Sequence, residues 1–317
     1  MWSYNLFGNT WRTFDNVTVN SLREAVAVNN GVFTQDTVYV CQYALYPYTK
    51  MVSKINEWTQ SQYVSELADS TSFVFATTTA RTDSIDGRSI PSLNCYGFKI
   101  TEGSGDKNQM VLTTPSQPAE TIALHGFEQA IDWLLSDDAI AQSLRQNFEI
   151  YVYPTQTPPS WYAGYSTSSA EDPTEEFNRT WGKGVLEERQ VHVQSFSNNL
   201  SSPIDVTIDF HNHSRLSDPP GGTGHSYFFG TDNTRGNDYL TALQNEIPNA
   251  TAVLSTGSDN TPSLRQFFED DFNTLLSITS ETVIRNDFNR PKWGSDSIGF
   301  LKAVETRYQA GDFTFSP

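Results

Sequence analysis

Residues 206–214 read Val-Thr-Ile-Asp-Phe-His-Asn-His-Ser, an apolar strand pattern that runs into two histidines. Side chains two residues apart on a strand point to the same side, so His211 and His213 are expected to share a face with Asp209. Ligands of α/β proteins bind at the carboxyl ends of strands. A single histidine is most often a structural group, but two beside a carboxylate indicate a metal ligand. The stretch therefore predicts a metal site at the end of a buried strand.

Strand-like and helix-like segments alternate along the chain on both sides of this stretch, a pattern that predicts an α/β fold. The predicted strands are Thr37–Ala44, Phe73–Thr78, Tyr96–Ile100, Met110–Thr113, Phe148–Tyr153, Val206–Phe210, Ala252–Ser255 and Leu275–Thr279. The predicted helices are Tyr48–Gln60, Glu120–Leu135, Asp138–Gln146, Gly184–Ser197, Asp238–Asn245, Leu264–Asn273 and Ser295–Ala310. Long loops are predicted at Thr155–Thr174 and Ser217–Gly224, and loops of this length in an α/β domain are usually functional.

The composition excludes several classes of protein. The chain of 317 residues has 20 Lys+Arg against 37 Asp+Glu and a net charge of −17, so it lacks the basic surface that nucleic-acid binding requires. No apolar run approaches the ~18 residues of a membrane span. The first residues, Met-Trp-Ser-Tyr-Asn, do not form a secretion signal, which makes a cytoplasmic location the default expectation. Cys41 and Cys95 lie in apolar segments and are predicted to be buried free thiols.

Three further polar motifs hold candidate residues: one opens a predicted helix, one lies in a loop, and one ends a predicted strand. Glu120 ends the segment Thr114-Pro-Ser-Gln-Pro-Ala-Glu120, and taken alone it would be a partner of a helix dipole. Asn178 and Arg179 suit the recognition of a carboxylate, with a surface salt bridge as the alternative. Glu281 ends another apolar strand, where it is either a general base or a cap.

In their order and spacing these motifs resemble the zinc carboxypeptidase family, and most of all its cytosolic-carboxypeptidase-like branch. The resemblance spans about residues 38 to 308. Segments that resemble the branch are Tyr43–Thr49, Ser84–Ile90, His211–Ser214 and Tyr227–Gly230. The family resemblance implies a phosphorylase/hydrolase-like α/β fold with a mixed, mostly parallel central sheet flanked by helices. Residues 1–37 would be a short N-terminal β segment, a reduced version of the domain that precedes the catalytic one in this branch, and residues 38–317 the carboxypeptidase-like domain.

The resemblance also implies one zinc ion and a set of site residues. The metal ligands would be Glu120 and His211, with Gln117 at the position of the family's first zinc histidine. Asn178 and Arg179 would bind the terminal carboxylate of a peptide or protein substrate. The remaining residues are Glu281, which matches the general base, and Glu176, which takes the place of an Asp that orients the missing histidine.

Two departures from the family pattern affect this site. The amide oxygen of Gln117 is a weaker and harder ligand than an imidazole, unless a hydrogen bond from its amide to Glu176 turns the oxygen towards the metal. The family's oxyanion arginine has no counterpart, since neither Lys nor Arg occurs between Gln146 and Asn178. The spacing of His125 and Glu128 also matches a metal motif, but these residues fall inside a predicted helix and are interpreted as a coincidence.

Two functions are therefore predicted. The first is a metallocarboxypeptidase-like hydrolase that uses a metal-activated water to remove the C-terminal residue of a peptide. The alternative is an inactive relative, a pseudoenzyme that serves as a peptide-binding or structural module. The polar, weakly charged composition would suit a virion or extracellular surface in that case. Nucleic acid and membranes are not expected partners of either.

Overall fold

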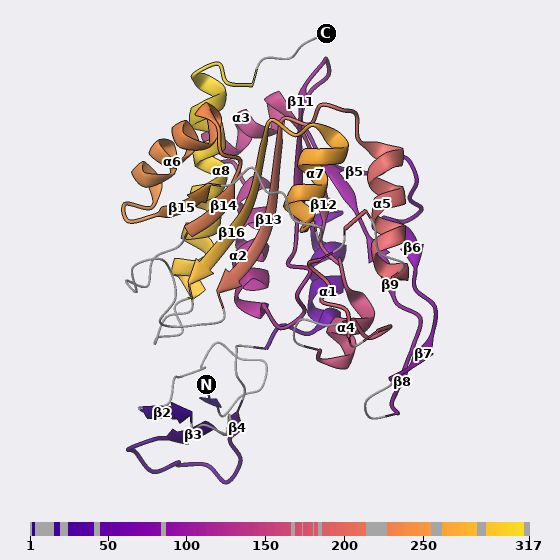
Figure 1. The fold of residues 1–317 in the computed structure, drawn as a ribbon, viewed down its shortest axis with the longest axis vertical. Coiled ribbons are helices and arrows are strands. Elements are labelled where there is room, and N and C mark those ends of the chain that lie inside the picture. The colour runs from indigo at the N-terminus through magenta and orange to yellow at the C-terminus, as the bar shows by residue number, and fades with distance from the viewer. Residues whose placement is uncertain are drawn as a thin grey trace.

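The computed structural model describes residues 2–3, 16–19, 25–40, 45–83, 87–165, 169–172, 174–179, 181–182, 186–213, 227–254, 262–283 and 290–313. At its centre is an eight-stranded sheet with the strand order β15-β14-β16-β13-β11-β12-β10-β5 (Figure 1). These strands are β5 (Val64–Glu66), β10 (Phe98–Ile100), β11 (Asn108–Thr113), β12 (Phe148–Tyr153), β13 (Val206–His213), β14 (Tyr227–Gly230), β15 (Thr251–Leu254) and β16 (Leu276–Val283).

The sheet is mixed, with a parallel centre. Strands β16, β13, β11 and β12 run parallel to one another, as β15 does to β14. Antiparallel pairs occur between β14 and β16 and at the edge formed by β10 and β5. The predicted fold class, α/β with a mixed, mostly parallel sheet, is confirmed.

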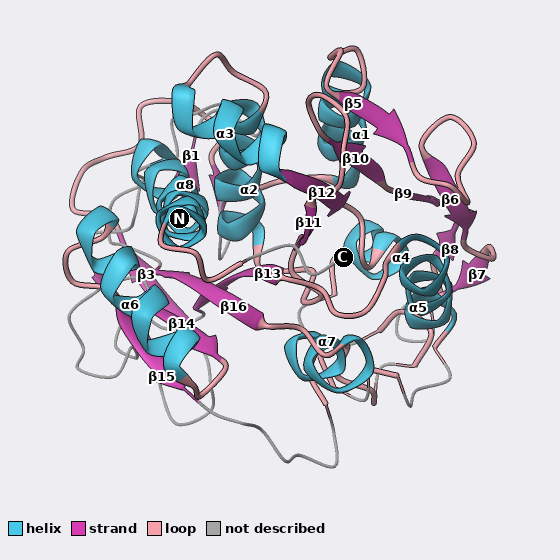
Figure 2. Cartoon of the chain, turned by 90° about the horizontal axis from the view of Figure 1, so that it is seen from above, coloured by secondary structure: helices cyan, strands magenta, loops and turns pink. Residues whose placement is uncertain are grey.

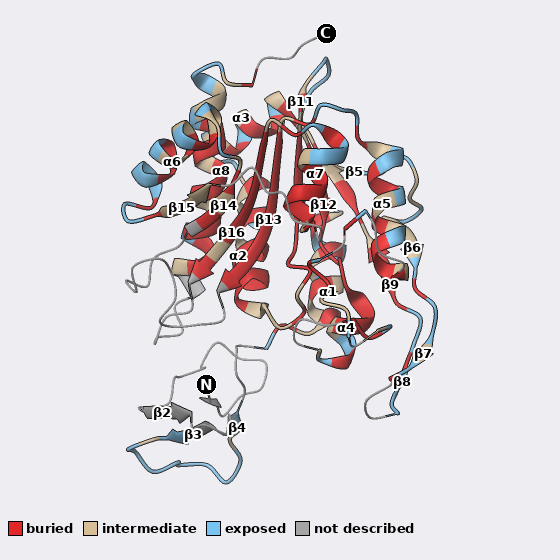
Figure 3. Cartoon of the chain, in the orientation of Figure 1, coloured by how far each residue is buried: buried red, intermediate tan, exposed pale blue. Residues whose placement is uncertain are grey.

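Helices cover both faces of this sheet (Figure 2). One face packs against α1 (Tyr48–Trp58), α2 (Thr121–Leu134), α3 (Ala139–Asn147), α6 (Thr234–Glu246) and α8 (Arg290–Gln309). The other face packs against α5 (Glu187–Asn199) and α7 (Leu264–Phe272). The central strands between these layers are buried along most of their length (Figure 3).

Alternation along the strands separates the two cores. Ile150 and Val152 of β12 point into the core with α2 and α8, whereas Tyr151 and Tyr153 point into the core with α5 and α7. Successive side chains on a strand face opposite ways, so a strand covered on both sides must be apolar throughout. The sequence Phe-Glu-Ile-Tyr-Val-Tyr of β12 comes close to this, and its predicted bounds are those observed.

Short strands lie outside the central sheet. The N-terminal region holds β1 (Trp2–Ser3) paired with β4 (Tyr39–Val40), and β2 (Asn16–Val19) paired with β3 (Ala25–Val28). The other two pairs are β6 (Val74–Thr77) with β9 (Asn94–Tyr96), and β7 (Arg81–Thr82) with β8 (Ser89–Ile90). The proposed division of the chain after residue 37 stays a prediction. None of the described helices combines the length and apolarity that crossing a bilayer requires.

Several predicted elements differ from those observed. The predicted loop 155–174 contains the helix α4 (Pro158–Ala163). Its two prolines occupy the first turn, where a backbone N–H would have no partner within the helix, so their lack of an N–H costs no hydrogen bond. The predicted strand 96–100 is divided at Gly97 between β9 and β10. Helix α6 begins four residues earlier than predicted, because the side chain of Asn233 accepts a hydrogen bond from the backbone of Gly236 and caps it.

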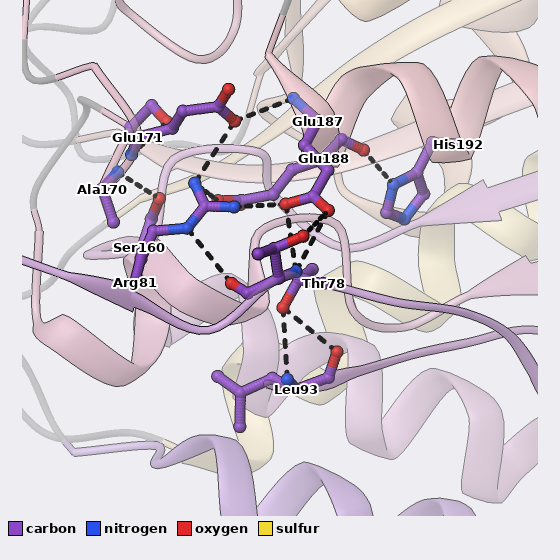
Figure 4. Close-up of polar contacts among 11 residues, drawn as sticks. Thr78, Arg81, Leu93, Ser160, Ala170, Glu171, Glu187, Glu188 and His192 are labelled. Carbon is purple, nitrogen blue, oxygen red and sulfur yellow. Dashed lines mark hydrogen bonds and ion pairs between the residues drawn. The ribbon is translucent and has the colours of Figure 1, made fainter. Parts of the chain in front are cut away.

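An ionic cluster joins the strand pair β7–β8 to helix α5 (Figure 4). Arg81 forms ion pairs with Glu171, at 3.2 Å, and with Glu187. The carboxylate of Glu188 lies further away, 3.9 Å from the guanidinium, and is completely buried. One turn along α5, Nδ1 of His192 is 2.6 Å from the backbone oxygen of Glu188.

Cys95 is a buried free thiol, as predicted, and Cys41 lies outside the described residues. The His125 ring packs edge-on against Tyr46, with 4.9 Å between ring centroids. Glu128 forms an ion pair of 2.7 Å with Lys50. His125 and Glu128 both lie inside α2, so their spacing reflects packing and ion pairing within the fold.

Candidate functional site

The parallel strands β11, β13 and β16 end at the same edge of the sheet, and most of the predicted site residues gather there. His211 of β13 is the register partner of Glu281 on β16. Glu120 stands at the N-cap of α2, the helix that follows β11. The topology of the parallel sheet therefore brings together three residues that are up to 161 positions apart in the sequence.

Glu120 does not cap its own helix. Its side chain makes no capping hydrogen bond, and the backbone N–H of Ala123 is bound by the side-chain oxygen of Asn212 at 3.0 Å. Oε2 of Glu120 instead accepts a hydrogen bond from the backbone N–H of Asn212, at 2.9 Å. These two bonds tie the start of α2 to the end of β13 and turn the Glu120 carboxylate towards His211.

The imidazole of His211 is completely buried between two carboxylates. Nε2 lies 2.8 Å from Oδ2 of Asp209, and Nδ1 lies 2.8 Å from Oε2 of Glu120. The first contact is a hydrogen bond, whereas Nδ1 has no aligned hydrogen-bond partner among the described residues. Burial disfavours the charged ring, but the negative charges of Asp209 and Glu120 outweigh it and hold the pKa of His211 well above its ordinary value.

The contact between Nδ1 of His211 and Oε2 of Glu120 is favourable when the ring is protonated at Nδ1 or when both atoms bind a metal ion. An ionised Asp209 can only accept, so Nε2 carries the proton that the two share. In a neutral ring Nδ1 then presents a lone pair to a carboxylate oxygen, and the two would repel each other at 2.8 Å. A proton or a metal ion between the two atoms removes this repulsion. An imidazole and a carboxylate are also two of the donor types that bind zinc.

Glu281 faces the same group of charges. Its Oε2 is buried and has no hydrogen-bond partner among the residues described. Burial is the main reason that the pKa of Glu281 is raised to about 8, and the negative charge of Glu120 adds to this effect. The positive charge of His211 acts in the opposite direction.

Asn178 and Arg179 adjoin this group from the loop that precedes α5. The side-chain oxygen of Asn178 accepts a hydrogen bond of 3.1 Å from the backbone N–H of Leu264, the first residue of α7. The amide nitrogen of Asn178 then lies 3.5 Å from Nε2 of His211. Arg179 donates to the backbone oxygen of Asn178 at 2.7 Å, and its side chain is about half exposed, at 46%.

Gln117 is attached to the Asn178–Arg179 loop. Its Nε2 donates to Oε1 of Glu176 at 3.2 Å, and Nη1 of Arg179 lies 3.6 Å from the same oxygen. The hydrogen bond considered from the sequence is thus present. Because the amide nitrogen faces the carboxylate, the carbonyl oxygen of Gln117 faces away from it. Its role as a metal ligand stays a prediction.

A set of three His, Cys, Asp or Glu side chains that could hold a metal ion together does not occur in the described part of the chain. Glu120 and His211 fit a divalent ion as two ligands, and among the described residues a third protein ligand would be of another type. The amide oxygen of Gln117 is the donor that the sequence offers. The side chain of His213 and the whole of His225 lie outside the described residues.

Three residues of the site were not assigned a role from the sequence. Asp209 supports His211 and in turn accepts hydrogen bonds from Thr113, at 2.8 Å, and from Gln156, at 3.4 Å. The sequence does mark Asp209, because it stands two positions before His211 on the same strand and so points to the same face of the sheet. Nothing in the sequence marked Thr113 and Gln156, which reach Asp209 from a neighbouring strand and from the turn after β12.

Solved structures share this arrangement of strands and helices. The metallo-carboxypeptidase of Burkholderia cenocepacia matches 98% of this chain and 80% of its own length with a TM-score of 0.74 and 15% identity. The Pseudomonas aeruginosa metallo-carboxypeptidase, solved with (2-guanidinoethylmercapto)succinic acid, matches 94% and 81% with a TM-score of 0.66 and 14% identity. Carboxypeptidase A of Helicoverpa armigera matches 86% of this chain over 75% of the length of that enzyme, with a TM-score of 0.52 and 13% identity.

The fold is that of the metallo-carboxypeptidases. The TM-scores of 0.52–0.74 establish a shared fold, and because the identities are only 13–15% the predicted resemblance is confirmed at the level of the fold. No model of a protein family matches the sequence, and no curated protein matches it either. The narrower resemblance to the cytosolic branch stays a prediction.

Proposed function

We propose that the chain is a metal-dependent carboxypeptidase with a modified metal site. The observation that carries this proposal is the convergence at one edge of the sheet of His211 and Glu120, whose Nδ1 and Oε2 atoms lie 2.8 Å apart, with Glu281 in register beside His211. Glu281, beside His211 on the next strand, has a buried oxygen without a hydrogen-bond partner among the described residues, which leaves that oxygen able to accept a proton. The metallo-carboxypeptidase fold supports the same assignment.

In this proposal Glu120 and His211 hold the metal ion, with the carbonyl oxygen of Gln117 as the third protein donor. When bound, a divalent ion supplies a Lewis acid that polarises the peptide carbonyl and lowers the pKa of water. Zinc is the ion that the fold leads us to expect. The amide donor makes its affinity lower than that of a site with two histidines and one carboxylate.

The remaining steps belong to side chains of the protein. Arg179 and Asn178 bind the C-terminal carboxylate of a peptide, which places the last peptide bond near Glu281. Glu281 takes a proton from the attacking water and delivers it to the leaving amine. A planar guanidinium beside an amide donor is suited to a carboxylate, which accepts two parallel hydrogen bonds.

Release of the C-terminal residue from a set of peptides, followed by mass spectrometry, tests this proposal. Turnover should disappear when a chelator is added, and Glu281→Gln should lower it by about 10²–10⁴-fold. Glu246→Gln, on the exposed surface of α6, is the matched control and should retain full activity. If Glu281→Gln is as active as the wild type, the assigned base is wrong.

A second candidate is a peptide-binding module that has lost catalysis. Two observations favour it, namely the amide at position 117 and the absence of Lys and Arg between Gln146 and Asn178. Loss of one oxyanion donor lowers the rate of comparable enzymes by about 10²–10³-fold. Binding of a free-carboxylate peptide without any turnover, in the presence of excess Zn²⁺, would select this candidate.

A further inference from the structure

Asp209 is the most heavily hydrogen-bonded group beside the proposed metal site. It is 2% exposed and lies in register with Thr113 on β11. Oδ1 accepts from the hydroxyl of Thr113 at 2.8 Å and from the amide of Gln156 at 3.4 Å, while Oδ2 pairs with Nε2 of His211 at 2.8 Å. Both oxygens of one buried carboxylate are therefore bound, from three different elements of the fold.

We propose that Asp209, held by Thr113 and Gln156, is a positioning residue that fixes the ring of His211. This inference rests on the proposed function, since it concerns the side of the imidazole that faces the metal site. With Nε2–H donated to Asp209, only Nδ1 is left to face Glu120. Turning the ring over would replace both nitrogens by carbons and lose the hydrogen bond to Asp209.

The arrangement is specific because each partner can act only in one direction. The carboxylate is an acceptor, so both Thr113 and Gln156 must donate to it. Their hydrogen bonds leave Oδ2 to face the ring. Thr113 is 1% exposed and Gln156 is also 1% exposed, so water does not compete for these contacts. Groups that orient a metal-binding histidine in this way typically contribute about 10–100-fold to metal affinity.

The first readout is the Zn²⁺ dissociation constant, measured by competition with a chromophoric chelator. Asp209→Asn should weaken Zn²⁺ binding by about 10–100-fold, and Thr113→Val should weaken it by a smaller factor. Asp205→Asn is the matched control, because Asp205 precedes the same strand and accepts a backbone hydrogen bond of 2.7 Å from Gln109, far from the site. Its Zn²⁺ affinity should equal that of the wild type.

The second readout does not require a metal. In ¹H–¹⁵N spectra of the imidazoles, the wild type should show a slowly exchanging Nε2–H signal, assigned to His211 by its absence in His211→Gln. In Asp209→Asn this signal should move upfield, because an amide is a weaker acceptor than a carboxylate. Thermal melting shows whether each variant is folded. Thr113→Val, which keeps the shape of the side chain, decides the matter if Asp209→Asn does not fold.

The outcomes separate this inference from the proposed function. A wild type that binds no Zn²⁺ but has the Nε2–H signal, with the upfield shift in Asp209→Asn, supports the positioning role and contradicts the metal site. Weakened Zn²⁺ binding together with the shift supports both. If Asp209→Asn and Thr113→Val keep the Zn²⁺ affinity and the Nε2–H signal of the wild type, the positioning role is overturned.

Discussion

Asn178 and Arg179 are neighbours in the sequence but are held in different ways. The amide of Asn178 is fixed by the backbone of Leu264, so its orientation depends on where α7 begins. The guanidinium of Arg179 is more exposed and has the carboxylate of Glu176 at 3.6 Å. A substrate carboxylate would therefore find a rigid amide donor beside a cation that can turn towards it.

This pair predicts a requirement for a free C-terminus. Wild-type protein should cleave a peptide acid and leave the same peptide amide intact. Arg179→Lys should raise the KM for the acid about tenfold or more, because the ammonium group cannot make two parallel hydrogen bonds to a carboxylate. Steady-state kinetics of both peptides measures this. Equal KM values for wild type and Arg179→Lys would show that the carboxylate binds elsewhere.

At the scale of residues, the sequence was informative where a motif has a fixed position in the fold. Glu120, His211 and Glu281 follow apolar strands or open a helix, and parallel strands bring such positions to one edge. Thr113 and Gln156 could not be identified in this way. Thr113 and Gln156 take part in the site through hydrogen bonds to Asp209, which lies 96 residues after Thr113 and 53 residues after Gln156 in the sequence. A local sequence pattern does not predict contacts between residues so far apart.

At the scale of elements, the packing of α2 on α8 depends on a close approach at Gly126. A Cβ atom added there would lie 2.3 Å from Oγ of Ser297 and 3.1 Å from the backbone oxygen of Trp293. Alanine is a better helix former than glycine by about 1 kcal/mol, yet the helices leave no room for its methyl group at this position.

Gly126→Ala should therefore lower the free energy of unfolding by about 1–3 kcal/mol, despite the gain in helix propensity. The double variant Gly126→Ala/Ser297→Ala removes the nearer of the two obstacles and should recover part of the loss. Urea unfolding of the two variants and of Ser297→Ala provides the comparison. A Gly126→Ala protein that is more stable than the wild type would contradict the close packing.

The elements themselves were predictable to different degrees. Strand β12 and helix α7 agree with their predicted bounds to within a residue, because an apolar run or an amphipathic pattern defines them. Two strands of four residues had different outcomes: β15 agrees with its predicted bounds to within one residue, whereas β14 was not predicted as a strand. Gly97 lies between β9 and β10, and a Cβ atom there would lie 2.5 Å from Cδ1 of Leu67, so the need for glycine at this position arises from a tertiary contact.

At the scale of the whole molecule, stability should depend on pH through a buried acid. Glu188 is completely buried, and neither of its oxygens has a hydrogen-bond partner among the described residues. Burial raises its pKa to about 8 in the folded protein, against an ordinary value of 4.5, although the charge of Arg81 opposes this shift. Between these two values the unfolded chain loses the proton of Glu188 and the folded protein keeps it.

The stability contributed by this group is thus fully present below pH 4.5 and is lost as the pH rises towards 8. Relative to Glu188→Gln, the wild type should lose about 1.4 kcal/mol of unfolding free energy per pH unit within that interval. Denaturant unfolding at several pH values measures the difference. The exposed Glu246→Gln is the control and should follow the wild-type curve. Parallel curves for the wild type and Glu188→Gln would show that Glu188 ionises normally in the fold.

The measurement that tests the metal site most directly is the metal content of the purified protein, by elemental analysis before and after dialysis against chelator. We expect the wild type to take up one equivalent of Zn²⁺ with low affinity. Gln117→His should bind it at least tenfold more tightly, because an imidazole is the better zinc ligand. His211→Gln is expected to bind none. If neither the wild type nor Gln117→His retains a metal ion, Glu120 and His211 share a proton instead, and the proposed metallocarboxypeptidase is contradicted.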